Sequence, residues 1–269
     1  MHSGPSSIET VNRQFSLKQT FLSIFPDYSQ NSIIFYICLI QTLMYLTLSI
    51  SSFYKDYEYS CILYYCGANI PSEVSLNYSV QRLVLPLILN FNFYQLLTTV
   101  LTLFFLGFSI DKVEGWKKFL GLFLYSGMFG YLCIDLGASQ HTFTVGSSSA
   151  LFGLYVALLT DWIIIKKYNF VFNKKYIITF IILALLLNLI SMIEGSSFTI
   201  IIGNIGGMLG GMLFILGFIQ FKWNIDEPSP IRSRYVKMIK VAIILFPILL
   251  FSLVLSRSTK PILLNCSVI

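Results

Sequence analysis

Seven long apolar segments divide the chain, and each is long enough to cross a lipid bilayer as an α-helix. A membrane-spanning helix needs roughly 20 apolar residues, because the hydrocarbon core holds no water to satisfy backbone groups. The segments lie at about 33–52, 91–110, 119–136, 147–165, 176–193, 198–221 and 238–255. Together they occupy about half of the 269 residues. We therefore expect one all-α polytopic membrane domain.

The composition excludes an ordinary soluble protein. Only 11% of the residues are charged and 56% are hydrophobic, whereas soluble domains carry about 25% charged residues. The net charge of +6 is divided among loops, so we expect contact with the bilayer and none with nucleic acid. We find no phosphate-binding glycine loop and no Cys/His cluster with metal-ligand spacing. The prediction is therefore that the protein needs neither a metal nor another cofactor.

The basic residues predict the orientation. With residues 1–32 as a cytosolic tail, 14 of the 18 Lys and Arg residues fall on the cytosolic side, as the positive-inside rule requires. No apolar stretch precedes residue 33, so we expect no cleavable signal peptide. The expected order is a cytosolic tail, a six-span core, a cytosolic linker, a seventh span and an exoplasmic tail. Their bounds are 1–32, 33–221, 222–237, 238–255 and 256–269, and the core has an exoplasmic first loop at 53–90.

The first loop carries two features that bear on the compartment. Asn77-Tyr78-Ser79 is a glycosylation triplet. Cys61 and Cys66 either pair in an oxidising compartment or stay as two free thiols. These features favour a membrane of the secretory pathway. The alternative is the mitochondrial inner membrane, because the stretch Thr10–Phe25 lacks acids and leaves a presequence open.

Two glycine-rich segments lie within spans. The first, Gly146–Leu154, opens the fourth span with three consecutive serines; a serine hydroxyl acts as a nucleophile only when a base lies beside it. The second, Gly203–Gly211, places Asn204 inside the sixth span, and a polar residue there is a functional candidate. Small residues let helices approach closely in lipid. The glycines expected to serve this packing are Gly146, Gly153, Gly206, Gly207 and Gly211.

These segments resemble the rhomboid family of intramembrane serine proteases. The family pairs a Gly-x-Ser-Gly-Ala stretch at the start of the fourth span with a His-x-Gly-Gly-x-x-x-Gly stretch in the sixth. The resemblance runs from about residue 67 to 217. Gly67-Ala68-Asn69 and Arg82 look like parts of the first loop, and Gly107–Gly115 looks like the turn after the second span, with Asp111 at the acidic place. The resemblance implies a six-helix core plus one C-terminal helix.

The departures from the family pattern fall on its catalytic positions. Ser148 stands at the nucleophile position, but Asn204 stands where the catalytic histidine is expected. Gln95 and Thr99 occupy the positions of the oxyanion-stabilising histidine and asparagine, Ser149 replaces the glycine after the nucleophile, and Gln81 replaces the first-loop tryptophan. A carboxamide cannot act as a general base near neutral pH. Loss of the general base lowers the rate of a serine hydrolase by a factor on the order of 10^4–10^6.

Three functional hypotheses remain from the sequence. The first is a proteolytically inactive rhomboid-like protein that binds transmembrane clients or partners, with Asn204 donating its amide across to the fourth span near Ser148. The second is an accessory structural subunit of a larger membrane complex. The third is an active intramembrane endopeptidase that uses Ser148 with His141 as a substitute base, since the other histidine, His2, lies in the cytosolic tail. Asp161 and Glu194 are expected to lie at the membrane interface. The spans contain few ionisable residues, which argues against a transporter.

Overall fold

The computed structural model describes residues 28–55, 58–160, 182, 197–218 and 230–257. Within these ranges the regular elements are helices, and the only extended pairing is an isolated antiparallel bridge between Asn69 and Thr144. The α-helices are α2 (Ile33–Lys55), α3 (Tyr59–Tyr65), α4 (Pro71–Leu76), α5 (Phe93–Thr102), α6 (Phe108–Glu114), α7 (Trp116–Gly137), α8 (Ser148–Thr160), α10 (Ser197–Phe218) and α11 (Pro230–Ser256). Short 3-10 helices cover Val80–Leu83 and Leu85–Ile88, and a π-helical segment, Leu103–Gly107, joins α5 to α6.

Five of the described helices are long and apolar enough to cross a membrane. They cover Ile33–Tyr54, Phe93–Lys112, Trp116–Gly137, Phe198–Phe218 and Lys237–Ser256. They coincide with the predicted first, second, third, sixth and seventh spans, which confirms the all-α polytopic fold. The helix α8 begins one residue after the predicted start of the fourth span. The predicted fifth span, 176–193, lies outside the described residues apart from residue 182.

Local sequence signals explain where the helices begin and end. The Asn92 side chain accepts a 2.8 Å hydrogen bond from the backbone N–H of Gln95 and so caps the start of α5. Gly115, with φ of +84°, separates α6 from α7, and only glycine adopts this conformation without strain. Pro230 is the first residue of α11, which therefore begins inside the predicted linker 222–237. A first-turn proline is tolerated because its missing N–H would have no helical partner.

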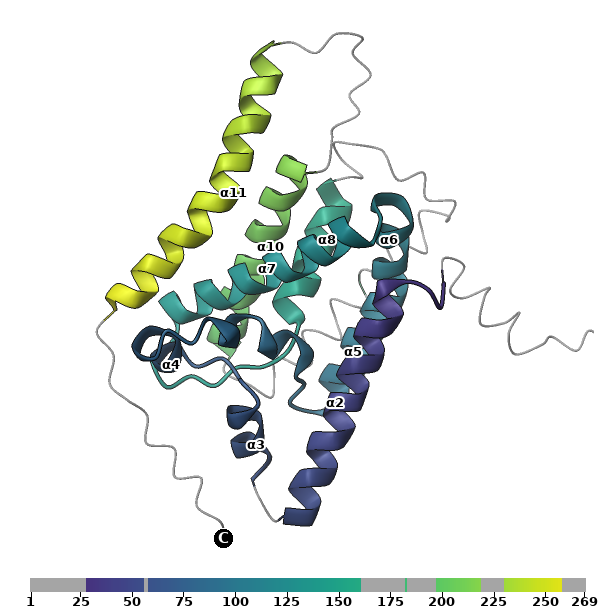
Figure 1. Ribbon diagram of the computed structural model, residues 1–269, viewed down its shortest axis with the longest axis vertical. Helices are drawn as coiled ribbons and strands as arrows, with labels where there is room; N and C mark the ends of the chain where they lie inside the picture. Colours follow the sequence, from purple (N-terminus) through teal and green to yellow (C-terminus); the bar gives the residue numbers. More distant parts are fainter. Residues whose placement is uncertain (1–27, 56–57, 161–181, 183–196, 219–229, 258–269) are drawn as a thin grey trace, which may run out of the picture.

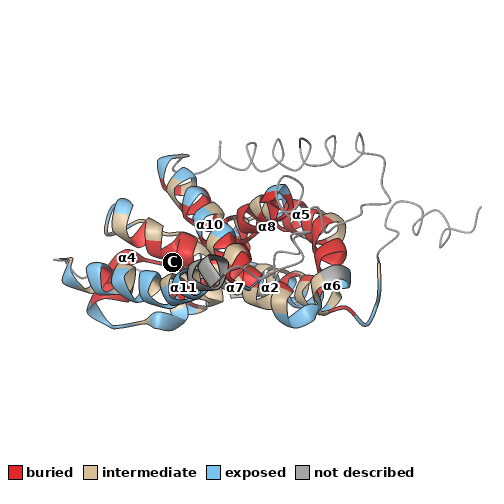
Figure 2. Cartoon of the chain, turned by 90° about the horizontal axis from the view of Figure 1, so that it is seen from above, coloured by how far each residue is buried: buried red, intermediate tan, exposed pale blue. Residues whose placement is uncertain are grey.

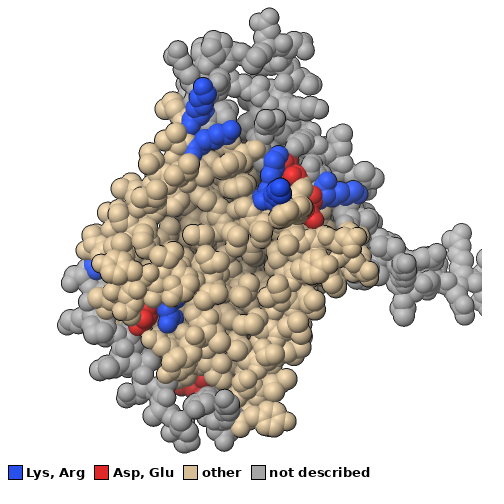
Figure 3. Space-filling view, in the orientation of Figure 1, with Lys and Arg blue, Asp and Glu red and all other residues tan. Residues whose placement is uncertain are grey.

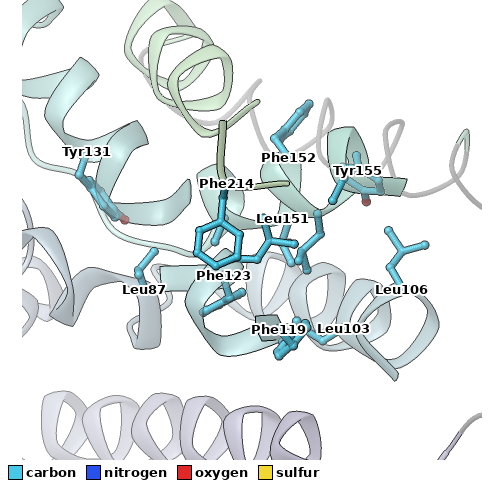
Figure 4. Packing of buried hydrophobic residues seen from close by; sticks show 14 of the residues in the cluster. Leu87, Leu103, Leu106, Phe119, Phe123, Tyr131, Leu151, Phe152, Tyr155 and Phe214 are labelled. Atoms are coloured by element: carbon cyan, nitrogen blue, oxygen red, sulfur yellow. The ribbon is translucent and has the colours of Figure 1, made fainter. Parts of the chain in front are cut away.

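The core lies where α7 packs against α8 and α10 (Figure 2). Phe123 of α7, Leu151 of α8 and Phe214 of α10 face one another at its centre (Figure 4). The helices α2 and α11 are peripheral. In their most apolar 18-residue stretches, 17% and 11% of the residues are buried, against 61% in α7. In lipid, tails solvate leucine as well as a protein core does, so close packing holds these helices together.

Glycines bring α7, α8 and α10 to close approach. A Cβ placed on Gly207 would overlap the backbone of Ser149, and one placed on Gly211 would lie 2.5 Å from the carbonyl oxygen of Gly153. Gly206 faces α7 in the same way, with its Cβ position 2.8 Å from the Sγ of Cys133. Any larger side chain at Gly207 or Gly211 would therefore push α8 and α10 apart.

The two ends of the helix bundle differ in charge. One end, here the lysine end, carries Lys112, Lys117 and Lys118 around the α6–α7 turn, and Lys237 and Lys240 near the start of α11 (Figure 3). The other end, here the loop end, carries α3, α4, the segment 138–147 and the last turn of α11 (Figure 1). Arg257, which follows α11, joins that helix to the end of α7, because its Nη1 donates to the backbone oxygens of Asp135 at 2.6 Å and Leu136 at 3.2 Å.

The first loop is folded against the rest of the loop end. Arg82 donates to the carbonyl oxygens of Tyr64 at 3.1 Å and Ala68 at 2.7 Å, and its guanidinium lies 4.7 Å from the centre of the Tyr64 ring. Cys61 is disulfide-bonded, whereas Cys66 is free. Both alternatives drawn from the sequence are therefore wrong, because Cys61 and Cys66 do not pair with each other and only Cys66 is a free thiol. Burial raises the pKa of the Cys66 thiol, so this group stays protonated near neutral pH.

Candidate functional site

Ser148 is the first residue of α8, directly after a tight turn at Val145-Gly146-Ser147. Gly146 has φ of +116°, its N–H donates to the Pro86 oxygen at 3.0 Å, and its carbonyl oxygen accepts from the Tyr131 hydroxyl at 2.5 Å. The turn is thus fixed from both the first loop and α7. It leaves Ser148 half-buried at a helix N-terminus, where backbone N–H groups lack helical partners.

The Gln95 side chain holds this turn from α5. Its Oε1 accepts the N–H of Phe91 at 2.7 Å, and its Nε2 donates to the Val145 oxygen at 2.9 Å. The amide therefore lies beside the turn that precedes Ser148, and two of its hydrogen-bonding positions are already used. Gln95, which stands at the family's oxyanion position, therefore braces the turn that precedes Ser148.

Ser147 and Thr99 are brought together below the same turn. Both are buried, and the Ser147 hydroxyl lies 3.4 Å from Oγ1 of Thr99 and 3.5 Å from Nε2 of Gln41. These distances are at the long limit for hydrogen bonds. Gln41 makes a firmer bond of 2.8 Å to the Leu87 oxygen. The sequence reasoning missed Gln41, although a glutamine inside the first span is a signal of the same kind as Asn204.

Asn204 lies in the middle of α10 with 4% of its surface exposed. Its neighbours on the helix, Gly203 and Gly207, face Ser149 in the first turn of α8. Neither Nδ2 nor Oδ1 of Asn204 has a hydrogen-bond partner among the described residues. The expectation that this amide donates across to the fourth span is therefore wrong. A buried unpaired amide costs about 1–3 kcal/mol per polar group.

In the described part of the chain, no His, Asp, Glu or Lys side chain bonds to the Ser148 hydroxyl. The Ser148 side chain has no hydrogen bond with the described residues. His141 is exposed on the 138–147 segment. The described ranges contain no group of three or more His, Cys, Asp and Glu residues that could hold a metal ion. Asp161 and Glu194 lie outside the described residues.

A second polar cluster lies at the loop end and was missed by the sequence reasoning. Asp135, near the end of α7, is fully buried and accepts a 2.8 Å hydrogen bond from Nδ2 of Asn69. Asn69 also pairs through its backbone with Thr144, at 2.9 and 3.0 Å. The cluster thus connects the first loop, α7 and the segment leading to Ser148. An acid inside the predicted third span was the available signal.

Asp111, the acidic residue of the turn after the second span, accepts a 2.5 Å hydrogen bond from the Ser32 hydroxyl. Ser32 precedes α2, and its Oγ also accepts the N–H of Ile34 at 3.2 Å. This contact joins the start of α2 to α6.

Comparisons with known proteins agree with the arrangement of these segments. Residues 77–221, more than half of the chain, match the Rhomboid domain. Rhomboid-like protease 1 of Toxoplasma gondii is 27% identical over 208 residues, which cover 76% of this chain and 69% of that protein. Rhomboid-like protease 3 of the same organism is 26% identical over 216 residues, covering 78% and 80%.

A plant relative matches over a shorter length. RHOMBOID-like protein 5 of Arabidopsis thaliana is 30% identical over 143 residues, which cover 51% of this chain and 43% of the plant protein. The match therefore spans less than half of that relative. With the Rhomboid domain covering the helices that hold Gln95, Ser148 and Asn204, the chain belongs to the rhomboid family.

Proposed function

We propose that this rhomboid-family membrane protein is proteolytically inactive and acts by binding membrane-spanning helices of client or partner proteins. The observation that carries the proposal is Asn204, a buried amide on α10 beside the first turn of α8. It stands where the family pattern has its histidine. An amide cannot take the proton of the Ser148 hydroxyl near neutral pH.

The surroundings of Ser148 support the same conclusion. His141 is exposed on a loop and has no hydrogen bond to Ser148. The Gln95 amide at the oxyanion position is engaged by Phe91 and Val145. Even a fully placed oxyanion donor does not replace a missing base, because it stabilises the charge that develops on the carbonyl oxygen and takes no proton from the serine.

Two features of the helix bundle support a binding role, the close glycine contacts and the unpaired amide of Asn204. The close glycine contacts between α7, α8 and α10 hold the helices together without any catalytic group. The amide of Asn204 has two N–H donors and an acceptor oxygen, all buried and unpaired among the described residues, so a polar side chain of another helix would reach them by displacing the residues that cover them. Hydrogen bonds of this kind stabilise helix association in membranes.

We also propose a secretory-pathway membrane, with the lysine end in the cytosol and α11 as a seventh span after a six-span core. The gathering of lysines at one end supports this orientation. The disulfide-bonded Cys61 at the opposite end supports an oxidising compartment there.

The test of inactivity is labelling of the purified full chain in detergent with a fluorophosphonate probe. An active rhomboid protease serves as the positive control, and Ser148→Ala marks the background. We expect labelling of the native chain to equal that of Ser148→Ala. Labelling of the native chain that is absent in Ser148→Ala would overturn the proposal. If labelling were also absent in His141→Ala, His141 would be identified as a substitute base.

The test of binding is photo-crosslinking from an unnatural amino acid placed at position 97 or 205. Leu97 on α5 and Ile205 on α10 are both exposed apolar residues. Crosslinks to membrane-spanning peptides, weakened by Asn204→Leu, are expected. A single partner recovered in equimolar amount would favour an accessory subunit of a membrane complex instead. Crosslinks to lipid alone at both positions would contradict a binding role.

A further inference from the structure

The turn at Asn77-Tyr78-Ser79 projects from the loop end of the molecule. Asn77 follows the last residue of α4 and is exposed, and Tyr78 is 68% exposed with φ of +50°. The flanking residues Leu76 and Val80 are also exposed, at 41% and 45%. The opposite face of α4, including Val74, is buried. The triplet therefore lies on the outside of the folded loop, where a large modification meets no packed neighbour.

The Asn77 side chain is held in place by its own helix. Its Nδ2 donates to Oε2 of Glu73 at 2.8 Å, and its backbone N–H donates to the Glu73 oxygen at 3.1 Å. The carboxamide nitrogen has two hydrogens. Replacement of one by a sugar leaves the other free to keep the bond to Glu73, so the modification is compatible with the local fold.

A second, independent observation indicates that this end of the molecule meets a lumenal environment. Cys61 of α3, in the same first loop, is disulfide-bonded. Stable disulfides are typical of the endoplasmic reticulum lumen and the cell surface, and are rare in the cytosol. Five lysines, Lys112, Lys117, Lys118, Lys237 and Lys240, lie at the opposite end (Figure 3), which the positive-inside rule places in the cytosol.

We propose that Asn77 is an N-glycosylation site, modified in the lumen of the endoplasmic reticulum. The co-reactant is an oligosaccharide joined to a lipid diphosphate. Nδ2 of Asn77 attacks the anomeric carbon, the N–C bond forms, and the bond from that carbon to the diphosphate oxygen breaks. The lipid diphosphate leaves with the electron pair, and the displaced amide proton passes to a base of the transferase. Ser79 supplies the hydroxyl that the Asn-x-Ser/Thr acceptor requires.

The test is expression of the full chain in eukaryotic cells, followed by peptide N-glycosidase treatment and gel mobility. The other acceptor triplet in the chain, Asn265-Cys266-Ser267, lies outside the described residues, so all variants carry Asn265→Gln. We expect the enzyme to shift this background variant by one glycan. Asn77→Gln and Ser79→Ala are expected to abolish the shift, and the matched variant Ser79→Thr to retain it.

Mass spectrometry keeps the proposal testable if a variant folds poorly. The glycosidase converts a glycosylated asparagine to aspartate, so the native peptide should contain Asp at position 77 after treatment. An unmodified Asn77 in protein extracted from cell membranes would overturn the proposal. That result would also remove support for the secretory pathway, but it would leave the fluorophosphonate test of inactivity unaffected.

Discussion

Nε2 of Gln95 donates a 2.9 Å hydrogen bond to the carbonyl oxygen of Val145, three residues before Ser148. The bond joins the first turn of α5 to the turn that begins α8. Gly146 follows Val145 with φ of +116°, and a Cβ at this position would overlap Nε2 of Gln95. The position therefore excludes a side chain for two reasons, one from the backbone and one from the neighbouring amide.

We predict that Gly146→Ala lowers the free energy of unfolding by about 2–5 kcal/mol, from backbone strain and overpacking together. The matched control is Gly115→Ala. Gly115 has φ of +84° but has no atom within 4 Å of its Cβ position, so only the strain, about 1–3 kcal/mol, applies. Thermal unfolding in detergent measures both. Equal losses in the two variants would show that the contact with Gln95 has no effect.

The spans could be predicted from the sequence because their length is set by the bilayer and read from local composition. Contacts across the loop end could not. The pairing of Asn69 with Asp135 and Thr144 joins residues far apart in the chain, and no local pattern encodes it. The position of Ser148 at the start of α8 was predictable from the Gly-Ser motif, whereas the use of Gln95 as a brace required the fold.

The cysteines illustrate the same limit of sequence-based prediction. Nearness in sequence suggested Cys61 and Cys66 as a pair, yet disulfides depend on the separation and direction of the Cβ atoms in the folded chain. Asp135 was overlooked because it lies among apolar residues near the end of a span, where its buried partner Asn69 cannot be seen from the sequence.

We predict that Asp135→Ala destabilises the protein by about 1–3 kcal/mol, because the buried amide of Asn69 loses its acceptor. Asp135→Asn retains an acceptor oxygen and should lose less. Ser139→Ala is the control, since it removes an exposed hydrogen bond to Thr142 and should change stability by less than about 0.5 kcal/mol. The readout is again the midpoint of thermal unfolding. A loss for Asp135→Ala no larger than for Ser139→Ala would contradict the prediction.

Close packing of α8 on α10 leads to a third prediction. Gly207→Ala is expected to destabilise the protein by about 1–3 kcal/mol, because its Cβ meets the rigid backbone of Ser149. In Gly217→Ala, near the end of α10, the new methyl group meets only side-chain atoms, those of Ile243 and Ile239, which can turn aside. The comparison therefore sets a backbone contact against side-chain contacts. A Gly217→Ala variant that unfolds as early as Gly207→Ala would argue against backbone contact as the cause.

We predict that Cys61→Ser lowers the free energy of unfolding by about 2–4 kcal/mol, the usual contribution of a disulfide. Cys66→Ser should have little effect, because Cys66 is free. Peptide mapping without reduction identifies the cysteine bonded to Cys61. Cys38, Cys66 and Cys133 are free, so none of these three is expected as the partner. A Cys61–Cys66 crosslinked peptide would contradict this expectation.

The unpaired amide of Asn204 gives the last prediction, which links stability to function. Replacing a buried polar group that has no partner by an apolar one of similar size removes a desolvation cost without losing a hydrogen bond. Asn204→Leu should therefore leave the unfolding temperature unchanged or raise it. Gln41→Leu is the matched contrast: Gln41 is also buried and its Oε1 has no partner among the described residues, but its Nε2 bonds to the Leu87 oxygen, so its loss should cost about 1–3 kcal/mol. If Asn204→Leu is stabilised yet forms fewer crosslinks to membrane-spanning peptides, the amide is retained for recognition at a cost in stability. If Asn204→Leu unfolds as early as Gln41→Leu, the amide has a structural partner, and its proposed role in binding a second helix fails.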